Sequence, residues 1–360
     1  MRHPLAARRI LRLALGGALC LWFSQAINWP LSFIAPAFTI LILALPLPTL
    51  GLKKGIGFIV ALIAPMIAGM ALLPVLVHAR WAGILLLGLA LFYTFYYTAR
   101  GGSAVLGTFM TVGLTLVTTI GSVNSELLVV LVQTMAVCAV VGLAFVWLAH
   151  LLVPDPPPGP SLPAFKPPVP PVPGPAEVQR RALRSLCVVF PLTLAFLFMS
   201  GSAAYTVVMI KVASLGQQAT SSQSRALGRS LLESTFWGGV AAIIAWYTLQ
   251  IWPSLTLYTL LFGLAGLYFG RGIFQGPAVG PKFSMWSYAY LTMLIILAPS
   301  VLDSPLVARD ANAAFWLRFF LIVLVAVWGS IAVAVFDAFA PEREERRDPK
   351  FRSHNPLKGQ

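Results

Sequence analysis

Apolar segments long enough to cross a membrane recur along the whole chain. Runs of about 18 to 25 predominantly apolar residues, separated by short polar stretches, extend from Ile10 to the region of Phe339. A helix of this length spans a hydrocarbon core of roughly 30 Å. Segments such as 84–91 are apolar on every face, whereas the strands of a membrane barrel alternate apolar and polar residues. The pattern therefore predicts an all-α integral membrane protein.

The limits of the apolar runs predict about twelve transmembrane helices in two sets of six. The first set covers residues 10–27, 31–50, 55–77, 81–98, 102–121 and 126–152. The second set covers residues 183–200, 202–217, 231–251, 253–270, 283–300 and 313–340. The chain then divides into a first six-span part (1–153), a proline-rich linker (154–179), a second six-span part (180–341) and a charged tail (342–360). Both the linker and the tail are expected to lie in the cytoplasm, the linker as an extended tether.

Two sequence landmarks indicate that the two parts are repeats. The basic opening Arg8–Arg12 recurs as Arg180–Arg184 at an offset of 172. The fourth span, enclosed by Trp81–Gly101, has its counterpart in Trp252–Gly272 at an offset of 171. Because each part holds an even number of spans, the repeats are expected to be parallel, related by an axis along the membrane normal.

The basic residues fall unevenly between the two sides of the expected spans. The chain is 58% hydrophobic and 10% charged, with a net charge of +14 and a mean hydropathy of +0.84. With the N-terminus inside, 21 of the 25 Lys and Arg residues lie in cytoplasmic segments, whereas Arg80 and Arg309 lie outside and Lys211 and Arg318 lie within spans. This asymmetry follows the positive-inside rule. It predicts a multi-pass protein of the bacterial inner membrane with both termini cytoplasmic, in a lipid bilayer and with no nucleic-acid partner.

Catalytic and cofactor motifs are absent from the sequence. The chain has no Walker loop, no His-Glu-x-x-His motif and no Gly-x-Ser-x-Gly elbow, and its four histidines are scattered. We therefore expect no enzyme, no cofactor and no metal site. Without an ATP site, any transport by this protein would draw on a proton or solute gradient.

Several segments resemble the fusaric-acid-resistance and aromatic acid exporter superfamily, and within it a bacterial inner-membrane family with two six-span halves. The resemblance covers nearly the whole chain. Its segments are Arg8–Leu15, Trp29–Pro36, Lys53–Gly55, Phe95–Gly101 and Leu152–Pro154.

The resemblance implies efflux of hydrophobic or aromatic weak acids or related toxic compounds, commonly with a periplasmic adaptor protein. Larger members carry a cytoplasmic domain after each six-span block, whereas this chain has only the linker and the tail. The sequence leaves open whether the protein forms homo-oligomers.

Two cations within the expected spans are the first candidates for a substrate site. Lys211 lies near the midplane of its span, and Arg318 lies roughly 9 Å into the last span. Charged residues at such depths usually face a cavity and mark a substrate or ion path. If both face one cavity, an anionic substrate is the natural counter-charge. The alternative is that each side chain snorkels to the membrane surface.

Aromatic and acidic residues supply further candidates. Tyr93, Tyr96 and Tyr97 share one helical face above Arg100 and could stack an aromatic substrate, although an interfacial aromatic belt explains them equally well.

Glu233 and Asp337 are candidates for proton coupling, because buried carboxylates can titrate near neutral pH. For each of them, a simple ion pair with a cytoplasmic basic residue is the competing interpretation, such as Glu233 with Arg229 at i,i+4 spacing.

These patterns predict a secondary transporter that exports a hydrophobic, anionic small molecule. One alternative is an anion channel, since plant malate-type channels resemble the same superfamily. Another is a non-transporting membrane scaffold of an envelope complex, held through the linker. Loss of function on deletion of residues 156–175, but not on substitution of Lys211, would favour the scaffold.

Overall fold

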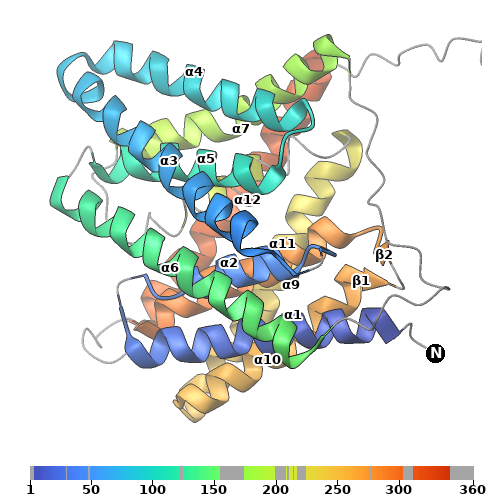
Figure 1. The fold of residues 1–360 in the computed structure, drawn as a ribbon. Coiled ribbons are helices and arrows are strands. Elements are labelled where there is room, and N and C mark those ends of the chain that lie inside the picture. The colour runs from blue at the N-terminus through green and yellow to red at the C-terminus, as the bar shows by residue number, and fades with distance from the viewer. Residues whose placement is uncertain are drawn as a thin grey trace, which may run out of the picture.

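Helices make up almost all of the described structure (Figure 1). The structure, a computed structural model, describes residues 4–29, 31–47, 49–121, 125–154, 174–198, 208, 211–213, 215–216, 224–275, 278–302 and 311–340. A single two-stranded antiparallel ribbon accompanies the helices in this part of the chain, with Phe274 opposite Val279 and Gln275 opposite Ala278. The all-α architecture agrees with the apolar pattern of the sequence.

The described helices fall into the two halves of the chain. In the first half they are α1 (Pro4–Ile27), α2 (Ile34–Leu43), α3 (Leu52–His78), α4 (Arg80–Ala99), α5 (Ala104–Gly121) and α6 (Ser125–Leu152). In the second half they are α7 (Pro175–Phe198), α9 (Ser224–Ile251), α10 (Leu255–Ile273), α11 (Phe283–Leu302) and α12 (Ala311–Phe339), with β1 (Phe274–Gln275) and β2 (Ala278–Val279) between α10 and α11.

Helix α2 is much shorter than the span expected at 31–50. It ends at Leu43, and the chain then runs without regular structure towards α3. Pro46 accounts for this end, because proline lacks an N–H donor and disfavours helical backbone at the residue before it. Pro36 is tolerated because it lies in the first turn, where no intrahelical donor is required.

Helix α7 begins at Pro175, within the range expected for the linker. Proline suits the first helical position, because its fixed φ is already helical and its missing N–H would have no partner there. Residues 155–173 of the expected linker, the tail at 342–360 and most of the expected eighth span at 202–217 lie outside the described residues.

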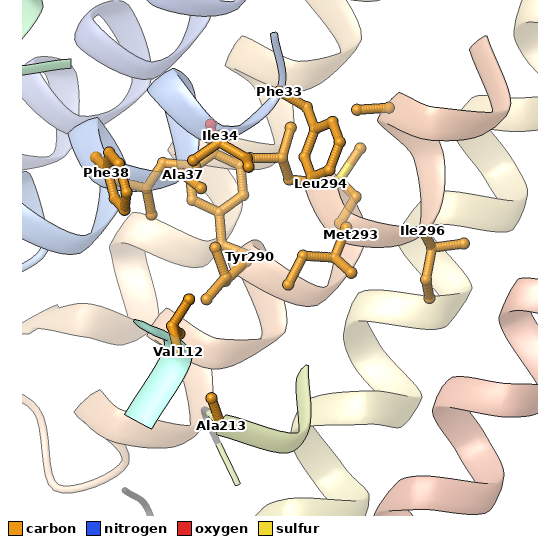
Figure 2. Packing of buried hydrophobic residues seen from close by; sticks show 14 of the residues in the cluster. Phe33, Ile34, Ala37, Phe38, Val112, Ala213, Tyr290, Met293, Leu294 and Ile296 are labelled. Atoms are coloured by element: carbon orange, nitrogen blue, oxygen red, sulfur yellow. The ribbon is translucent and has the colours of Figure 1, made fainter. Parts of the chain in front are cut away.

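The core is built around α11, α2 and α5. Residues 289–300 of α11 are buried without interruption, so this helix is enclosed on every side. Nine of the ten residues of α2 are buried, as are residues 111–119 of α5. Figure 2 shows Phe33, Ile34 and Ala37 close to Tyr290, Met293 and Leu294 of α11. Large apolar side chains therefore join elements of both halves at the centre.

Many large apolar side chains lie on the outer surface. Trp81, Leu85, Leu324 and Phe339 expose 78%, 74%, 63% and 87% of their surfaces. A soluble monomer rarely exposes such a contiguous apolar surface. Of the described helices, seven are long and apolar enough to cross a membrane (α1, α3, α4, α6, α7, α11 and α12), and α2 and α5 are shorter apolar helices. The chain is thus a multi-pass membrane protein.

Helices from the two halves pack against each other in pairs. Helix α1 lies along α10 and α4 lies along α7, with α2 and α11 between these pairs (Figure 1). The α1–α10 contact depends on Gly266, where an added Cβ would lie 2.9 Å from the Ala14 Cα atom and 2.8 Å from the Tyr290 hydroxyl. Small residues permit such close approach of membrane helices.

Candidate functional site

Lys211 lies inside the bundle against the middle of α11. Its residue is 1% exposed, and its Nζ donates a hydrogen bond of 2.6 Å to the Thr292 hydroxyl. Thr292 is the tenth residue of the 20-residue α11, and its hydroxyl in turn donates to the Tyr288 carbonyl at 2.6 Å. The threonine hydroxyl thus serves as an acceptor for the lysine while its own proton is engaged. The hydroxyl satisfies one lysine N–H and brings no negative charge.

Arg318 is the second buried cation, and it also contacts α11. It lies on α12, is 7% exposed, and its Nη1 donates to the Ser300 hydroxyl at 3.4 Å. Ser300 donates to the Ile296 carbonyl at 3.0 Å. Arg318 and Lys211 are therefore both enclosed by protein.

The two cations reach α11 at separate points. Thr292 and Ser300 are eight residues apart, which is roughly 12 Å along a helix axis. The structure therefore brings Lys211 and Arg318 to one helix without placing them side by side. Neither lines the cavity of about 490 Å³ between α9 and α10.

Two of the three tyrosines of α4 lie on the outside of the bundle. Tyr93 is 62% exposed and Tyr97 is 40% exposed, while Tyr96 is half-buried. The rings of Tyr93 and Tyr96 pack against Phe92, at centroid distances of 5.9 and 6.1 Å. This arrangement fits an interfacial aromatic belt better than a stacking site beside Lys211.

Glu233 forms ion pairs at the surface. Its carboxylate accepts from Arg229 Nε at 2.6 Å and from Lys282 Nζ at 2.9 Å. The i,i+4 pair with Arg229 that competed with the proton-coupling interpretation is thus present. Side chains of Arg229 and Lys282 are 82% and 58% exposed, so solvent screens both pairs.

Asp337 joins the end of α12 to the start of α7. Its Oδ1 lies 3.1 Å from Arg180 Nη1 and 3.6 Å from Arg184 Nη1. Arg184 is fully buried, and Glu177 binds Arg180 at 2.8 Å and Arg181 at 2.7 Å. The Asp337 carboxylate is therefore held by two guanidinium groups, and its role in proton coupling stays a prediction.

Sequence reasoning missed two arginine clamps that hold the ends of α6 and α12. Arg12 donates through Nε and Nη2 to the Val153 carbonyl at 3.2 and 2.8 Å, and Arg8 Nη1 donates to the Pro154 carbonyl at 3.0 Å. In the second half, Arg180 Nη1 donates to the Ala340 carbonyl at 3.1 Å. Carbonyls at a helix C-terminus lack intrahelical donors and carry partial negative charge, so cations stabilise them. The sequence signal for both clamps is the basic opening that recurs at Arg8–Arg12 and Arg180–Arg184.

Within the described residues, no group of three or more His, Cys, Asp or Glu side chains is arranged to hold a metal ion. The chemistry that this part of the chain offers is binding by buried cations, hydroxyls and apolar surface.

Residues 9–149 match a family model described as "Protein of unknown function (DUF2955)". The matched stretch runs from near the start of α1 to near the end of α6, and so includes Arg12 but not its partner Val153, nor Lys211 or Arg318. No curated protein and no solved structure matches the chain.

Proposed function

We propose that this protein is a secondary transporter of the bacterial inner membrane that exports hydrophobic or aromatic weak acids, with a periplasmic adaptor continuing the path outward. The observation that carries the proposal is Lys211, a cation buried in the middle of an apolar helical bundle. The resemblance of the sequence to aromatic acid exporters supports the same substrate class.

Lys211 lies where a positive charge is unfavourable. A lysine at the centre of a membrane helix raises the free energy of insertion by about 2.5 to 3.5 kcal/mol on translocon scales. The Thr292 hydroxyl at 2.6 Å supplies a hydrogen bond without neutralising the charge. An organic anion would bind this side chain well, because a carboxylate makes a strong, charge-assisted hydrogen bond to an ammonium group. Arg318 of α12, which is hydrogen-bonded to Ser300 of α11, would give such an anion a second binding position along α11.

We propose the layout of twelve spans in two parallel repeats, with both termini cytoplasmic, as the frame of this transporter. Helix packing supports it, because the contacts recur when each helix is replaced by its counterpart in the other half, six numbers away. The pair α1–α10 corresponds to α7–α4, α3–α5 to α9–α11, and α1–α6 to α7–α12. The clamps of Arg8 on Pro154 and of Arg180 on Ala340 correspond in the same way.

Fusions at defined loops test the layout. Alkaline phosphatase fused after Ala79 should be active, because the layout places this connection between α3 and α4 in the periplasm. Fusion after Gly101 should be inactive, and a fluorescent protein at the same position should be bright. The reverse pattern would contradict the orientation.

A transport assay with Lys211 variants tests the function. In an efflux-deficient bacterium, the wild-type protein with any adaptor encoded beside it should lower the accumulation of a labelled hydrophobic aromatic acid and raise survival. Lys211→Met should abolish this effect, because it keeps the length of the side chain and removes the charge, whereas Lys211→Arg should retain part of it. Lys54→Met is the matched control, because Lys54 is exposed at the start of α3.

Two outcomes would count against the proposal. Full export by Lys211→Met at equal membrane abundance would remove Lys211 from the path. Absence of protection against every acid in a broad panel would contradict the substrate class.

The same buried cations also suit a passive anion channel, which is the second candidate. In proteoliposomes, a coupled transporter concentrates the labelled acid against its gradient when a proton gradient is imposed. A channel only brings the acid to electrochemical equilibrium. The final ratio of internal to external acid therefore separates the two candidates.

A further inference from the structure

An apolar groove lies between α9 and α10 on the outside of the second half. Its volume is about 490 Å³, which falls in the range of roughly 300 to 1,000 Å³ typical of ligand pockets. The groove exists because alanines line it where larger side chains would fill it, namely Ala241 and Ala245 on α9 and Ala265 on α10. Two further lining residues, Phe269 of α10 and Met293 of α11, are buried.

One end of the groove is cationic and aromatic. Arg271 lies there in the last turn of α10, beside Tyr268 of α10 and Trp237 of α9. Both of these rings pack on Trp286, at centroid distances of 6.0 Å. Amphipathic rings together with an arginine are typical of the level at which lipid headgroups meet the hydrocarbon core. The opposite end, towards Leu261, is entirely apolar.

The length of the groove corresponds to one leaflet. Leu261 and Arg271 are ten residues apart on α10, which is about 15 Å along the axis, or half of the roughly 30 Å hydrocarbon core. Its walls face outward, since Ile244, Leu264 and Tyr268 are 61%, 64% and 50% exposed. In a membrane this outward side is occupied by lipid, so the molecule that reaches the groove first is a bilayer component.

The charge of the groove selects an anionic headgroup. The three acidic side chains that the structure describes, Glu177, Glu233 and Asp337, form ion pairs with other cations. Among the described residues, therefore, no carboxylate neutralises Arg271. A phosphate would accept a bidentate hydrogen bond from its guanidinium, the geometry for which arginine is especially suited.

We propose that this groove binds one acidic phospholipid, with its phosphate on Arg271 and an acyl chain along Ala241, Ala245 and Ala265. The inference does not depend on the transport function. It assigns a lipid site to the α9–α10 face, apart from Lys211 and Arg318.

Photocrosslinking to defined lipids tests the proposal. Purified full-length protein is placed in nanodiscs of phosphatidylcholine in which about one lipid in ten is a probe lipid. The probe is either phosphatidylglycerol or phosphatidylcholine and carries a diazirine in one acyl chain. After irradiation and digestion, mass spectrometry measures the labelled peptides from residues 237–245 and 261–271. We expect the phosphatidylglycerol probe to label these peptides roughly fivefold more than the phosphatidylcholine probe, as one favourable basic residue at the membrane surface predicts.

Three variants and a competitor sharpen the test. Arg271→Gln should reduce the phosphatidylglycerol labelling to that of phosphatidylcholine, because the side chain is exposed and only its charge is removed. Arg100→Gln is the matched control, since Arg100 occupies the equivalent place at the end of α4 and lies outside the groove. Ala265→Phe should fill the groove and lower labelling by both probes. Millimolar benzoate is added as a competing soluble aromatic acid.

Equal labelling by the two probes in the wild type, or a preference that survives Arg271→Gln, would overturn the proposal. Displacement of the probe by benzoate but not by unlabelled phosphatidylglycerol would also overturn it, in favour of a solute site. If Ala265→Phe fails to give a monodisperse protein, the comparison of Arg271→Gln with Arg100→Gln still decides.

Discussion

Removal of the Asp337 carboxylate should destabilise the junction between α7 and α12. The change Asp337→Ala leaves the fully buried Arg184 and the largely buried Arg180 without the carboxylate 3.6 and 3.1 Å away. Loss of one partner of a buried ion pair costs about 3 to 5 kcal/mol. We expect about 3 kcal/mol, the lower end, because the Asp337 side chain keeps 17% exposure and Arg180 keeps Glu177 at 2.8 Å.

The measurement is the free energy of unfolding from SDS titration in mixed micelles, with Glu233→Ala as the control. Glu233 also carries two ion pairs, but its partners Arg229 and Lys282 are mostly exposed, so its loss should cost less than about 1 kcal/mol. As a second comparison, Asp337→Ala is made in an Arg184→Met background. There it should lower the free energy of unfolding less than in the wild type, because the buried charge of Arg184 is already gone.

The reasoning is refuted if Asp337→Ala and Glu233→Ala have the same unfolding free energy. An intact stability together with lost proton-driven transport in Asp337→Ala would instead support the proton-coupling role predicted from the sequence.

Three further predictions follow from packing. Gly266→Leu should sharply lower the yield of monodisperse protein in size-exclusion chromatography, because even a Cβ there would lie 2.9 Å from the Ala14 Cα atom, and intact yield would contradict the α1–α10 contact. Arg12→Gln should lower the unfolding free energy by about 1 to 2 kcal/mol through loss of its two hydrogen bonds to the Val153 carbonyl, and an unchanged SDS titration would rule out this clamp. An apolar maleimide should label the folded protein in detergent once, at the exposed Cys187, and three times after unfolding, because Cys20 and Cys138 are buried. Mass spectrometry counts the adducts.

Individual helices were largely predictable from the sequence. The spans expected at 55–77, 81–98 and 126–152 agree within a few residues with α3 (Leu52–His78), α4 (Arg80–Ala99) and α6 (Ser125–Leu152). The expectation failed at 31–50, where apolar composition extended beyond α2 and prolines ended the helix early. Hydropathy measures how well a segment suits lipid, whereas the backbone of Pro46 decides where the helix stops.

The candidate site was predictable only in part. Lys211 and Arg318 stood out as cations in apolar runs, and both are buried. Their attachment to hydroxyls of one helix, α11, could not be foreseen, because it joins residues 81 and 18 positions apart. The Asp337–Arg180 contact spans 157 positions, so the sequence indicated a basic partner for Asp337 without identifying which residue it is.

The sequence by itself determined that the chain forms apolar helices in a membrane, because every backbone hydrogen bond of such a helix is satisfied within a continuous segment of the chain. Only the tertiary structure decided that α1 lies on α10, that α11 is enclosed on every side and that a groove opens between α9 and α10. Lipid tails are as apolar as the helices, so apolar composition does not select which helices meet. That choice depends on the fit of small residues such as Gly266 and on hydrogen bonds between side chains that the sequence keeps far apart.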